Sequence, residues 1–261
     1  MELRPIIIDA SAYPPEFHPL LAGGNIYDSS CSPQAKVIFI DKDGGYFLKT
    51  AQKGKLEREA AMTRYFHSKG LSANIMAYVS SEADWLLTEK IHGNDCIAAK
   101  YLAQPKRLCD TLAERLAILH SQDYSGCPNQ NHTKWLLDTA KQNMRTGAYD
   151  KSHFPDSYGY ACPEQAWAVV KSHGHLLKND TLLHGDYCLP NIILNDWEFA
   201  GFIDLDNAGV GDRHVDVFWA IWSLSFNLRT HEYRERFIDA YGRGKVDEEI
   251  LRVVAAIEVF G

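Results

Sequence analysis

The sequence lacks the features that mark membrane-spanning, secreted and repeat proteins. No apolar run approaches the roughly 20 residues needed to cross a bilayer. The start, Met1-Glu2-Leu3-Arg4-Pro5, has no signal-peptide pattern, and there is no internal repeat or low-complexity segment. We therefore expect a cytoplasmic globular protein with no membrane partner.

Cysteine is scarce and scattered. The six cysteines form no CxxC pair, which argues against a zinc site or a disulfide framework and favours reduced thiols. His173-Gly174-His175 suggests a metal site at first sight, but no third ligand lies nearby in the sequence. Cysteine and histidine spacing therefore gives no support for a zinc protein.

Positive charge is also in deficit, because the formal net charge is −7 at pH 7. Nucleic acid is an unexpected partner for such a chain, since phosphate backbones are bound by Lys and Arg. A negative surface is compatible with attracting a small cationic molecule. The 261 residues, 46% apolar and 23% charged, are enough for one large domain or two fused lobes with a core.

The predicted secondary structure changes in character after Gly93. Before it, Val and aromatic-rich runs predict strands at 37–40, 46–49, 75–79 and 85–88. One helix is predicted at 56–69, where apolar residues recur at helical spacing and Gly70 follows as a stop. Helical periodicity dominates later, at 108–120, 134–144, 164–177, 216–226, 232–241 and 248–259. We expect an α+β protein with a β-rich lobe at 1–93 and a mainly helical lobe at 94–261.

The most informative stretch is His184-Gly185-Asp186-Tyr187-Cys188-Leu189-Pro190-Asn191, followed by Phe202-Ile203-Asp204. It spaces Asp186, Asn191 and Asp204 in the order that eukaryotic-like kinases use. In those enzymes the first carboxylate meets the attacking hydroxyl, and the other two side chains hold magnesium against the nucleotide phosphates. Hard oxygen ligands suit this chemistry, which is mostly positioning and neutralisation of phosphate charge.

The local context supports this interpretation of the motif. Short strands are predicted at 192–194 and 199–203, with a turn at 195–196, so the motif lies on a loop and a hairpin. A lone His-Gly-Asp would more often be a polar turn beside a buried hairpin. Its combination with Asn191 and Asp204 favours phosphoryl transfer.

Phosphoryl transfer also requires a cation on the nucleotide phosphates, and Lys49 is the candidate. It ends the predicted strand 46–49 and shares a face with Phe47. Glu59 on the following helix could pair with Lys49 and orient its ammonium group. Glu57 competes for this role, but Glu59 adjoins the apolar stripe of the helix. The alternative for Lys49 is a solubility residue on an edge strand.

Two further positions suit a nucleotide but also have ordinary explanations. Ser29-Ser30-Cys31-Ser32 consists of small residues whose amides could approach phosphate, although no Walker A sequence follows and a simple turn is the alternative. Phe47 could cover an adenine ring or be a core aromatic residue.

Taken together, the sequence resembles the aminoglycoside 3′-phosphotransferases of the kanamycin kinase type over nearly its whole length. The matching blocks are 31–37, 46–49, 56–59, 86–93, 119–121, 184–191, 201–204 and 211–216. The resemblance implies a two-lobed, protein-kinase-like fold with nucleotide bound by the first lobe. It also implies transfer of the ATP γ-phosphate to the 3′-hydroxyl of an aminoglycoside antibiotic, with Mg²⁺ as cofactor and GTP as a possible donor.

Roles on the nucleotide side follow from the same resemblance. Asp186 would be the catalytic base, with Asn191 and Asp204 as magnesium ligands. Lys49 would contact phosphates, with Glu59 as its partner.

The remaining nucleotide contacts are implied by position alone. Ser32 would lie in the phosphate loop. The backbone of Glu89 and Ile91 would bind adenine beneath Phe47. Outside the nucleotide site, the resemblance implies that Asp212 and Asp216 brace the catalytic loop and the helix after it.

Acceptor recognition is where the sequence departs from its relatives. A polycationic acceptor needs several carboxylates, yet Phe226, Asn227 and Ile257 stand where some relatives have acidic residues. Asp206-Asn207 replaces the usual Gly-Arg after the second motif Asp. The remaining candidates for substrate binding are Asp156, Asp206, Glu258 and the terminal carboxylate of Gly261.

Other functions remain open from the sequence. A kinase of the same fold could act on another amino-alcohol or sugar, such as choline or homoserine, or the chain could be a pseudokinase-like module that holds nucleotide without turnover. A protein kinase is disfavoured, because no Ala-Pro-Glu segment or long activation loop follows Asp204. The expected partner is a small cationic molecule, and we expect a monomer or a weak homodimer.

Overall fold

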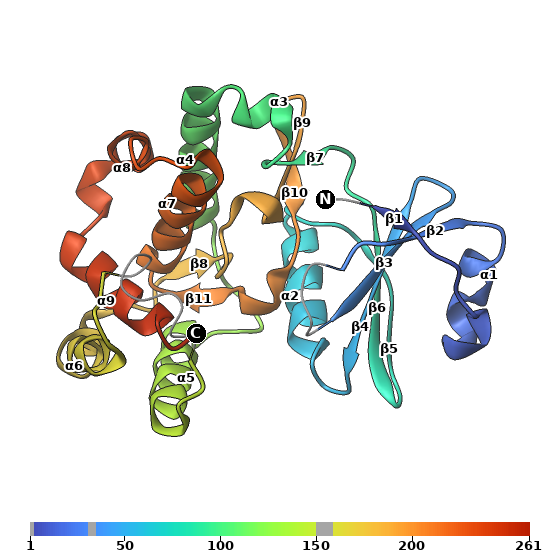
Figure 1. Ribbon diagram of the computed structural model, residues 1–261, viewed down its shortest axis with the longest axis horizontal. Helices are drawn as coiled ribbons and strands as arrows, with labels where there is room; N and C mark the ends of the chain where they lie inside the picture. Colours follow the sequence, from blue (N-terminus) through green and yellow to red (C-terminus); the bar gives the residue numbers. More distant parts are fainter. Residues whose placement is uncertain (1–2, 31–34, 150–158) are drawn as a thin grey trace. The chain divides into compact units, whose positions relative to one another are not determined.

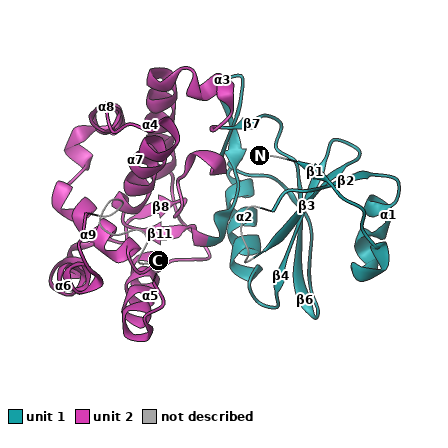
Figure 2. Cartoon of the chain, in the orientation of Figure 1, with its two compact units in different colours: residues 1–95, 192–206 teal, residues 96–191, 207–261 magenta. Residues whose placement is uncertain are grey.

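The computed structural model describes residues 3–30, 35–149 and 159–261, and Figure 1 shows their helices and strands. The chain divides into two compact units (Figure 2): residues 1–95 with 192–206, and residues 96–191 with 207–261. The expected division into 1–93 and 94–261 used continuous segments, whereas these units join the hairpin after Asn191 to the first one. Chain order alone did not reveal that this hairpin pairs with earlier residues.

Unit 1 is built on an antiparallel sheet of six strands in the order β1-β2-β3-β4-β6-β5. The strands are β1 (Arg4–Pro5), β2 (Asn25–Asp28), β3 (Lys36–Asp41), β4 (Tyr46–Gln52), β5 (Ile75–Ser80) and β6 (Ala83–Glu89). The four strands predicted from the sequence are confirmed. The β4 strand continues past the expected end at Lys49, because Thr50 pairs with Trp85 and Ala51 with Asp84 of β6.

Alternation of side chains explains why these strands form one sheet with a buried face. Ile38 and Ile40 of β3 are buried with Leu48 of β4 and Leu87 of β6. The short helix α1 (His18–Leu21) and the segment before it contribute Phe17 and other apolar residues to the same cluster. Burial of this cluster stabilises the sheet, since each buried aliphatic side chain contributes about 1.5–3 kcal/mol.

The helix α2 (Glu57–Ser68) and a small second sheet complete unit 1. The second sheet has the order β10-β9-β7, formed by Glu198–Phe202, Ile192–Asn195 and Asn94–Asp95. The predicted hairpin at 192–203 is therefore confirmed. Phe202 N donates to Leu71 O, which ties the end of β10 to the turn after α2.

Unit 2 is mainly helical, as expected. Its helices are α3 (Ala99–Leu102), α4 (Pro105–His120), α5 (His132–Thr146), α6 (Pro163–His173), α7 (His214–Leu228), α8 (Arg234–Tyr241) and α9 (Glu248–Glu258). A two-stranded sheet of β8 (Thr181–Leu183) and β11 (Gly209–Gly211) lies among them (Figure 1). In the described ranges, no helix has the length and apolar character needed to span a membrane.

The helices of unit 2 pack through the faces that the periodicity predicted. Leu108, Leu112, Leu116 and Leu119 of α4 are all buried. A second cluster joins α5, α6, α7 and α9 around residues such as Val170, Val215 and Ile257. The 3.6-residue pattern thus identified both the helices and their buried sides.

Asp84 holds the start of α2 in place within unit 1. This carboxylate is fully buried and accepts the amide of Leu56 at 2.9 Å and the hydroxyl of Ser80 at 2.7 Å. Leu56 is the residue at the N-terminal cap of α2, and its own side chain makes no capping bond. A residue of β6 therefore caps the helix that carries Glu59.

We predict that Asp84→Ala lowers the free energy of unfolding by about 2–4 kcal/mol, because a buried amide loses its acceptor and a second bond is lost. Urea denaturation would measure the change. Ser80→Ala removes only one of the bonds and should cost about 1 kcal/mol. Equal losses in the two variants would contradict a capping role for Asp84.

Candidate active site

Three charged side chains of the sequence motifs meet in unit 1. Lys49 Nζ lies 2.7 Å from Glu59 Oε2 and 2.7 Å from Asp204 Oδ1. Strand β4 supplies the lysine, α2 supplies the glutamate, and the segment after β10 supplies the aspartate. The expected pairing of Lys49 with Glu59 is present, whereas Glu57 is exposed to solvent.

The electrostatics of this group keep the lysine charged. Burial alone would lower the pKa of Lys49, but the carboxylates of Glu59 and Asp204 outweigh it and raise the pKa above its ordinary value. Glu59 is buried, while the side chain of Asp204 is 52% exposed. The Lys49 ammonium group is thus held by the buried carboxylate of Glu59 and also contacts the carboxylate of Asp204, which is accessible to solvent.

Asp186 and Asn191 lie together in unit 2, on the loop after β8. Asn191 Nδ2 donates to the backbone oxygen of Asp186 at 3.0 Å and to its Oδ2 at 2.9 Å. Asn191 is buried and Asp186 is partly exposed. The amide therefore orients the carboxylate, and its own Oδ1 is the atom of Asn191 that could meet a cation.

The backbone of this loop is held by Asp216 of α7. Asp216 Oδ2 accepts the amide of His184 at 2.8 Å, and Oδ1 accepts the amide of Gly185 at 2.7 Å. Gly185 has φ +82°, and a Cβ at this position would lie 1.9 Å from Asn207 O. Gly185 of the His-Gly-Asp motif is therefore required for two reasons: its backbone has a positive φ, and the carbonyl of Asn207 leaves no room for a side chain.

Asp212 has a similar structural role. Its carboxylate accepts the amides of Lys178 and His214, at 2.7 and 2.9 Å. It also pairs with the ring of His214 at 2.6 Å. These bonds confirm the expectation that Asp212 and Asp216 brace the helix and the catalytic loop.

The positions expected to bind the nucleotide base belong to unit 1. Phe47 is partly buried, with its ring centroid 5.0 Å from that of Phe39. The amide of Glu89 donates to Asn74 O at 3.1 Å, and Glu89 pairs with Tyr46 of β4 at the end of β6. The side chain of Ile91 packs over Gly201, where a Cβ would be 2.7 Å from it. Ser32 lies outside the described residues.

The candidates for acceptor binding have unequal surroundings. Glu258 is buried near the end of α9, and Gly261 is exposed, with its amide donating to Glu258 O. Asp206 in unit 1 forms a two-point ion pair with Arg58. Asp156 lies outside the described residues.

Among the described candidates for acceptor binding, Glu258 has a pKa that differs from its ordinary value. Burial, reinforced by the nearby Asp186 carboxylate, raises its pKa to about 8, although Trp219 Nε1 donates to Glu258 Oε1 at 3.2 Å. The carboxyl group is therefore mostly protonated at neutral pH. A cation brought beside it would favour the charged form.

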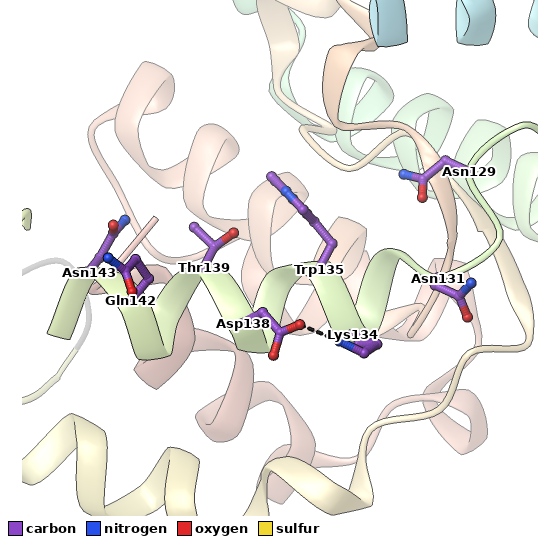
Figure 3. Close-up of a pocket in the computed structure, with 8 residues that line it drawn as sticks. All are labelled: Asn129, Asn131, Lys134, Trp135, Asp138, Thr139, Gln142 and Asn143. Atoms are coloured by element: carbon purple, nitrogen blue, oxygen red, sulfur yellow. Dashed lines mark hydrogen bonds and ion pairs between the residues drawn. The ribbon is translucent and has the colours of Figure 1, made fainter. Parts of the chain in front are cut away.

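A shallow cavity of about 530 Å³ runs along one face of α5, where Trp135, Asp138 and Asn143 lie among its lining residues (Figure 3). Lys134 and Asp138 pair with each other on this face. None of the expected site residues lines the cavity. Asn143 Nδ2 donates to Phe260 O at 2.7 Å, which ties α5 to the C-terminal turn.

Sequence reasoning missed several residues that support the site. Arg58 is one of them, and its partner Asp206 lies 148 positions away, so no local pattern marks the pair. His120 Nε2 donates to Asp216 at 3.1 Å, and Tyr241 donates to His120 Nδ1 at 2.7 Å. The His at the end of the predicted α4 stripe was the one signal that could have pointed to this network.

Unit 1 and unit 2 each carry a side chain whose chemistry suits magnesium. Asn191 Oδ1 and the partly exposed Asp204 carboxylate are hard oxygen donors, and Mg²⁺ commonly takes one or two such protein ligands beside phosphate oxygens. Among the described residues there is no cluster of three or more His, Cys, Asp or Glu side chains able to hold a metal by itself.

Comparisons with known proteins agree with this chemistry. The family model described as "Phosphotransferase enzyme family" matches residues 29–253. A probable aminoglycoside 3′-phosphotransferase from Lactococcus lactis is 48% identical over 260 residues, which are 99% of each chain. An aminoglycoside 3′-phosphotransferase from Niallia circulans is 30% identical over 177 residues, covering 68% of this chain and 67% of that protein.

Solved structures show the same fold. A type VIII aminoglycoside 3′-phosphotransferase matches with a TM-score of 0.78 at 23% identity, covering 96% of each chain. An aminoglycoside phosphotransferase from Streptomyces rimosus, solved with ADP and streptomycin, matches with a TM-score of 0.74 at 20% identity, covering 97% of this chain and 99% of that one. The expected α+β, protein-kinase-like fold with a β-rich and a helical lobe is confirmed. The chain belongs to the phosphotransferase enzyme family and resembles its aminoglycoside 3′-phosphotransferase members.

Proposed function

We propose that the protein transfers the γ-phosphate of ATP to the 3′-hydroxyl of an aminoglycoside antibiotic. The observation that carries the chemistry is the Asp186 carboxylate, which Asn191 orients on a loop held by Asp216. The choice of acceptor is supported by the near full-length similarity to the Lactococcus lactis relative. Such transfer would make the protein a determinant of antibiotic resistance.

Asp186 would act on the acceptor hydroxyl. Its carboxylate would accept or orient the hydroxyl proton as the oxygen attacks the γ-phosphorus and the bond to the β-phosphate oxygen breaks. This role needs hydrogen-bond reach more than a shifted pKa. When bound, Mg²⁺ held by Asn191 and Asp204 supplies neutralisation of phosphate charge.

The nucleotide would be held by groups of unit 1. Lys49, fixed by Glu59, would contact the α- and β-phosphates, and Ser32 would lie in the phosphate loop. The carbonyl of Glu89 and the amide of Ile91 would bind the adenine edge, with Phe47 over the ring. GTP remains a possible second donor.

The acceptor would be recognised by carboxylates that meet its ammonium groups. Glu258, the terminal carboxylate of Gly261 and Asp156 are the proposed contacts. Because the Glu258 carboxyl is buried, a desolvated ion pair there would be stronger than one on the surface. We further propose that the protein acts in the cytosol as a monomer or a weak homodimer.

The function is tested by supplying purified protein with ATP and Mg²⁺ and a panel of acceptors. Kanamycin and neomycin should be phosphorylated, whereas gentamicin, which lacks a 3′-hydroxyl, should not. Turnover with choline or homoserine, and none with the antibiotics, would show that the protein is a kinase for another acceptor and not for aminoglycosides. Nucleotide binding without turnover on any compound would identify a pseudokinase-like module.

We predict that Asp186→Ala lowers turnover at least about a hundredfold, because the acceptor hydroxyl loses its proton acceptor. Binding of ATP, measured by calorimetry, should stay nearly unchanged. Asp138→Ala removes an exposed aspartate of α5 in the same unit and is the matched control, with turnover near that of the parent protein. Turnover unaffected by Asp186→Ala would refute the assignment.

We predict that Glu258→Gln stabilises the protein at high pH. The pKa of Glu258 is about 8 in the folded state, against about 4.3 for an exposed glutamate. Between these values the folded state binds more protons than the unfolded state. The free energy of unfolding therefore falls with rising pH, by at most about 1.4 kcal/mol per pH unit from this group.

Glutamine keeps an acceptor for Trp219 and carries no charge, so it removes this loss. Urea denaturation should show little advantage of Glu258→Gln at about pH 5 and a clear advantage above about pH 8. Glu249→Gln, an exposed change on the same helix, is the matched control. A stability difference that does not grow with pH would contradict the prediction. The variant should also show a raised KM for the polycationic acceptor, since glutamine cannot ionise when an ammonium group is brought beside it.

A further inference from the structure

Arg58 and Asp206 form a second link between α2 and the segment that carries Asp204. Arg58 Nε donates to Asp206 Oδ1 at 3.1 Å, and Arg58 Nη2 donates to Oδ2 at 2.7 Å. This two-point geometry is the strong form of an arginine–carboxylate pair. The side chains are 33% and 38% exposed, so the pair is partly shielded from solvent.

The pair runs parallel to the lysine bridge described above. Arg58 precedes Glu59 on α2, and Asp206 follows Asp204 by two residues. Lys49 connects Glu59 with Asp204. Two neighbouring residues of one helix are therefore joined to two nearby residues of one turn.

The two links differ in what ligand binding would do to them. The Lys49–Asp204 contact uses the ammonium group and the carboxylate that the proposed function assigns to phosphate and metal. Both groups would have to turn toward the ligand. The Arg58–Asp206 pair uses atoms that have no such role, so it can persist when nucleotide binds.

The turn needs such an anchor because its backbone is strained. Asp204 has φ +60°, in the left-handed region that residues other than glycine rarely adopt. This conformation is unfavourable for a residue with a side chain, and it persists only where the surroundings hold it. Leu205 is fully buried, and Asp206 is held by Arg58.

We propose that Arg58 and Asp206 are a positioning pair that holds Asp204 for the magnesium–nucleotide complex, and that Asp206 does not contact the acceptor. The inference rests on the proposed function and specifies one part of its site.

If Asp206 instead contacted the acceptor, the Arg58 and Asp206 variants would change the acceptor KM in opposite directions. If Asp206 met an ammonium group of the acceptor, Arg58→Gln would release the carboxylate and lower the acceptor KM, whereas Asp206→Asn would raise it. If the two residues position Asp204, both substitutions impair magnesium-dependent nucleotide binding in the same direction. The acceptor KM then changes little in either variant.

The experiment uses calorimetry to measure how strongly the full chain binds a non-hydrolysable ATP analogue at a series of Mg²⁺ concentrations. Arg58→Gln and Asp206→Asn should each raise the Mg²⁺ concentration for half-maximal binding by about three- to tenfold, and the double variant should be no worse than either single one. The exchanged pair, Arg58→Asp with Asp206→Arg, should recover a large part of the loss.

Arg236→Gln is the matched control. Arg236 forms a similar two-point pair with Asp110 in unit 2, far from these residues in sequence and without a role in the proposed site. Its Mg²⁺ requirement should equal that of the parent protein. Thermal unfolding of every variant would confirm that each remains folded under the conditions of the titration.

An unchanged Mg²⁺ requirement in Arg58→Gln, or additive losses in the double variant, would overturn the inference. Opposite shifts of the acceptor KM in Arg58→Gln and Asp206→Asn would do the same and return Asp206 to the acceptor site. Failure of the parent protein to bind the analogue at any Mg²⁺ concentration would instead count against the proposed function itself.

Discussion

The loop that carries Asp186 depends on one buried anion. Asp216 is fully buried, and a carboxylate in such a place is costly unless several donors meet it. The loop amides of His184 and Gly185 and the ring of His120 are those donors. Burial would raise the pKa of Asp216, but the bonds to His120 and to the loop outweigh it and lower the pKa, so the group stays ionised. A segment with no regular structure thus acquires a fixed backbone.

The same carboxylate connects the loop to the helical framework of unit 2. Burial lowers the pKa of His120, which keeps the ring neutral at neutral pH despite the aspartate beside it. A neutral ring can donate from Nε2 to Asp216 and accept at Nδ1 from Tyr241, whose ring stacks with Phe237 of α8. Helices α4, α7 and α8 therefore share one hydrogen-bond chain that ends at the residue before Asp186.

The sequence predicted what depends on local pattern. Helices with apolar residues at helical spacing, such as α4, and the long strands β3 to β6 were found near their observed bounds, because periodicity records which side of each is buried. The motif residues Asp186 and Asn191 were found together, since only five positions separate them. Strands of two or three residues, such as β1, β8 and β11, carry too short a pattern to be distinguished from turns.

What the sequence could not predict was pairing over long distances. Nothing near Arg58 marks Asp206 as its partner, and the position of His120 at the end of its helix does not identify Asp216 of α7 as the group it bonds. Such pairs depend on how elements pack after the chain has folded. The sequence predicted Asp206 as a candidate contact of the acceptor, whereas the structure shows its carboxylate paired with Arg58.

The bond from Trp219 to Glu258 has a spectroscopic consequence. Indole emission responds to charge placed near the ring, and Trp219 Nε1 lies 3.2 Å from a carboxyl group that can be neutral or ionised. Trp222 lies close as well, with ring centroids 5.5 Å apart. The fluorescence of this aromatic pair should therefore report whether that carboxyl holds its proton, without any label attached to the chain.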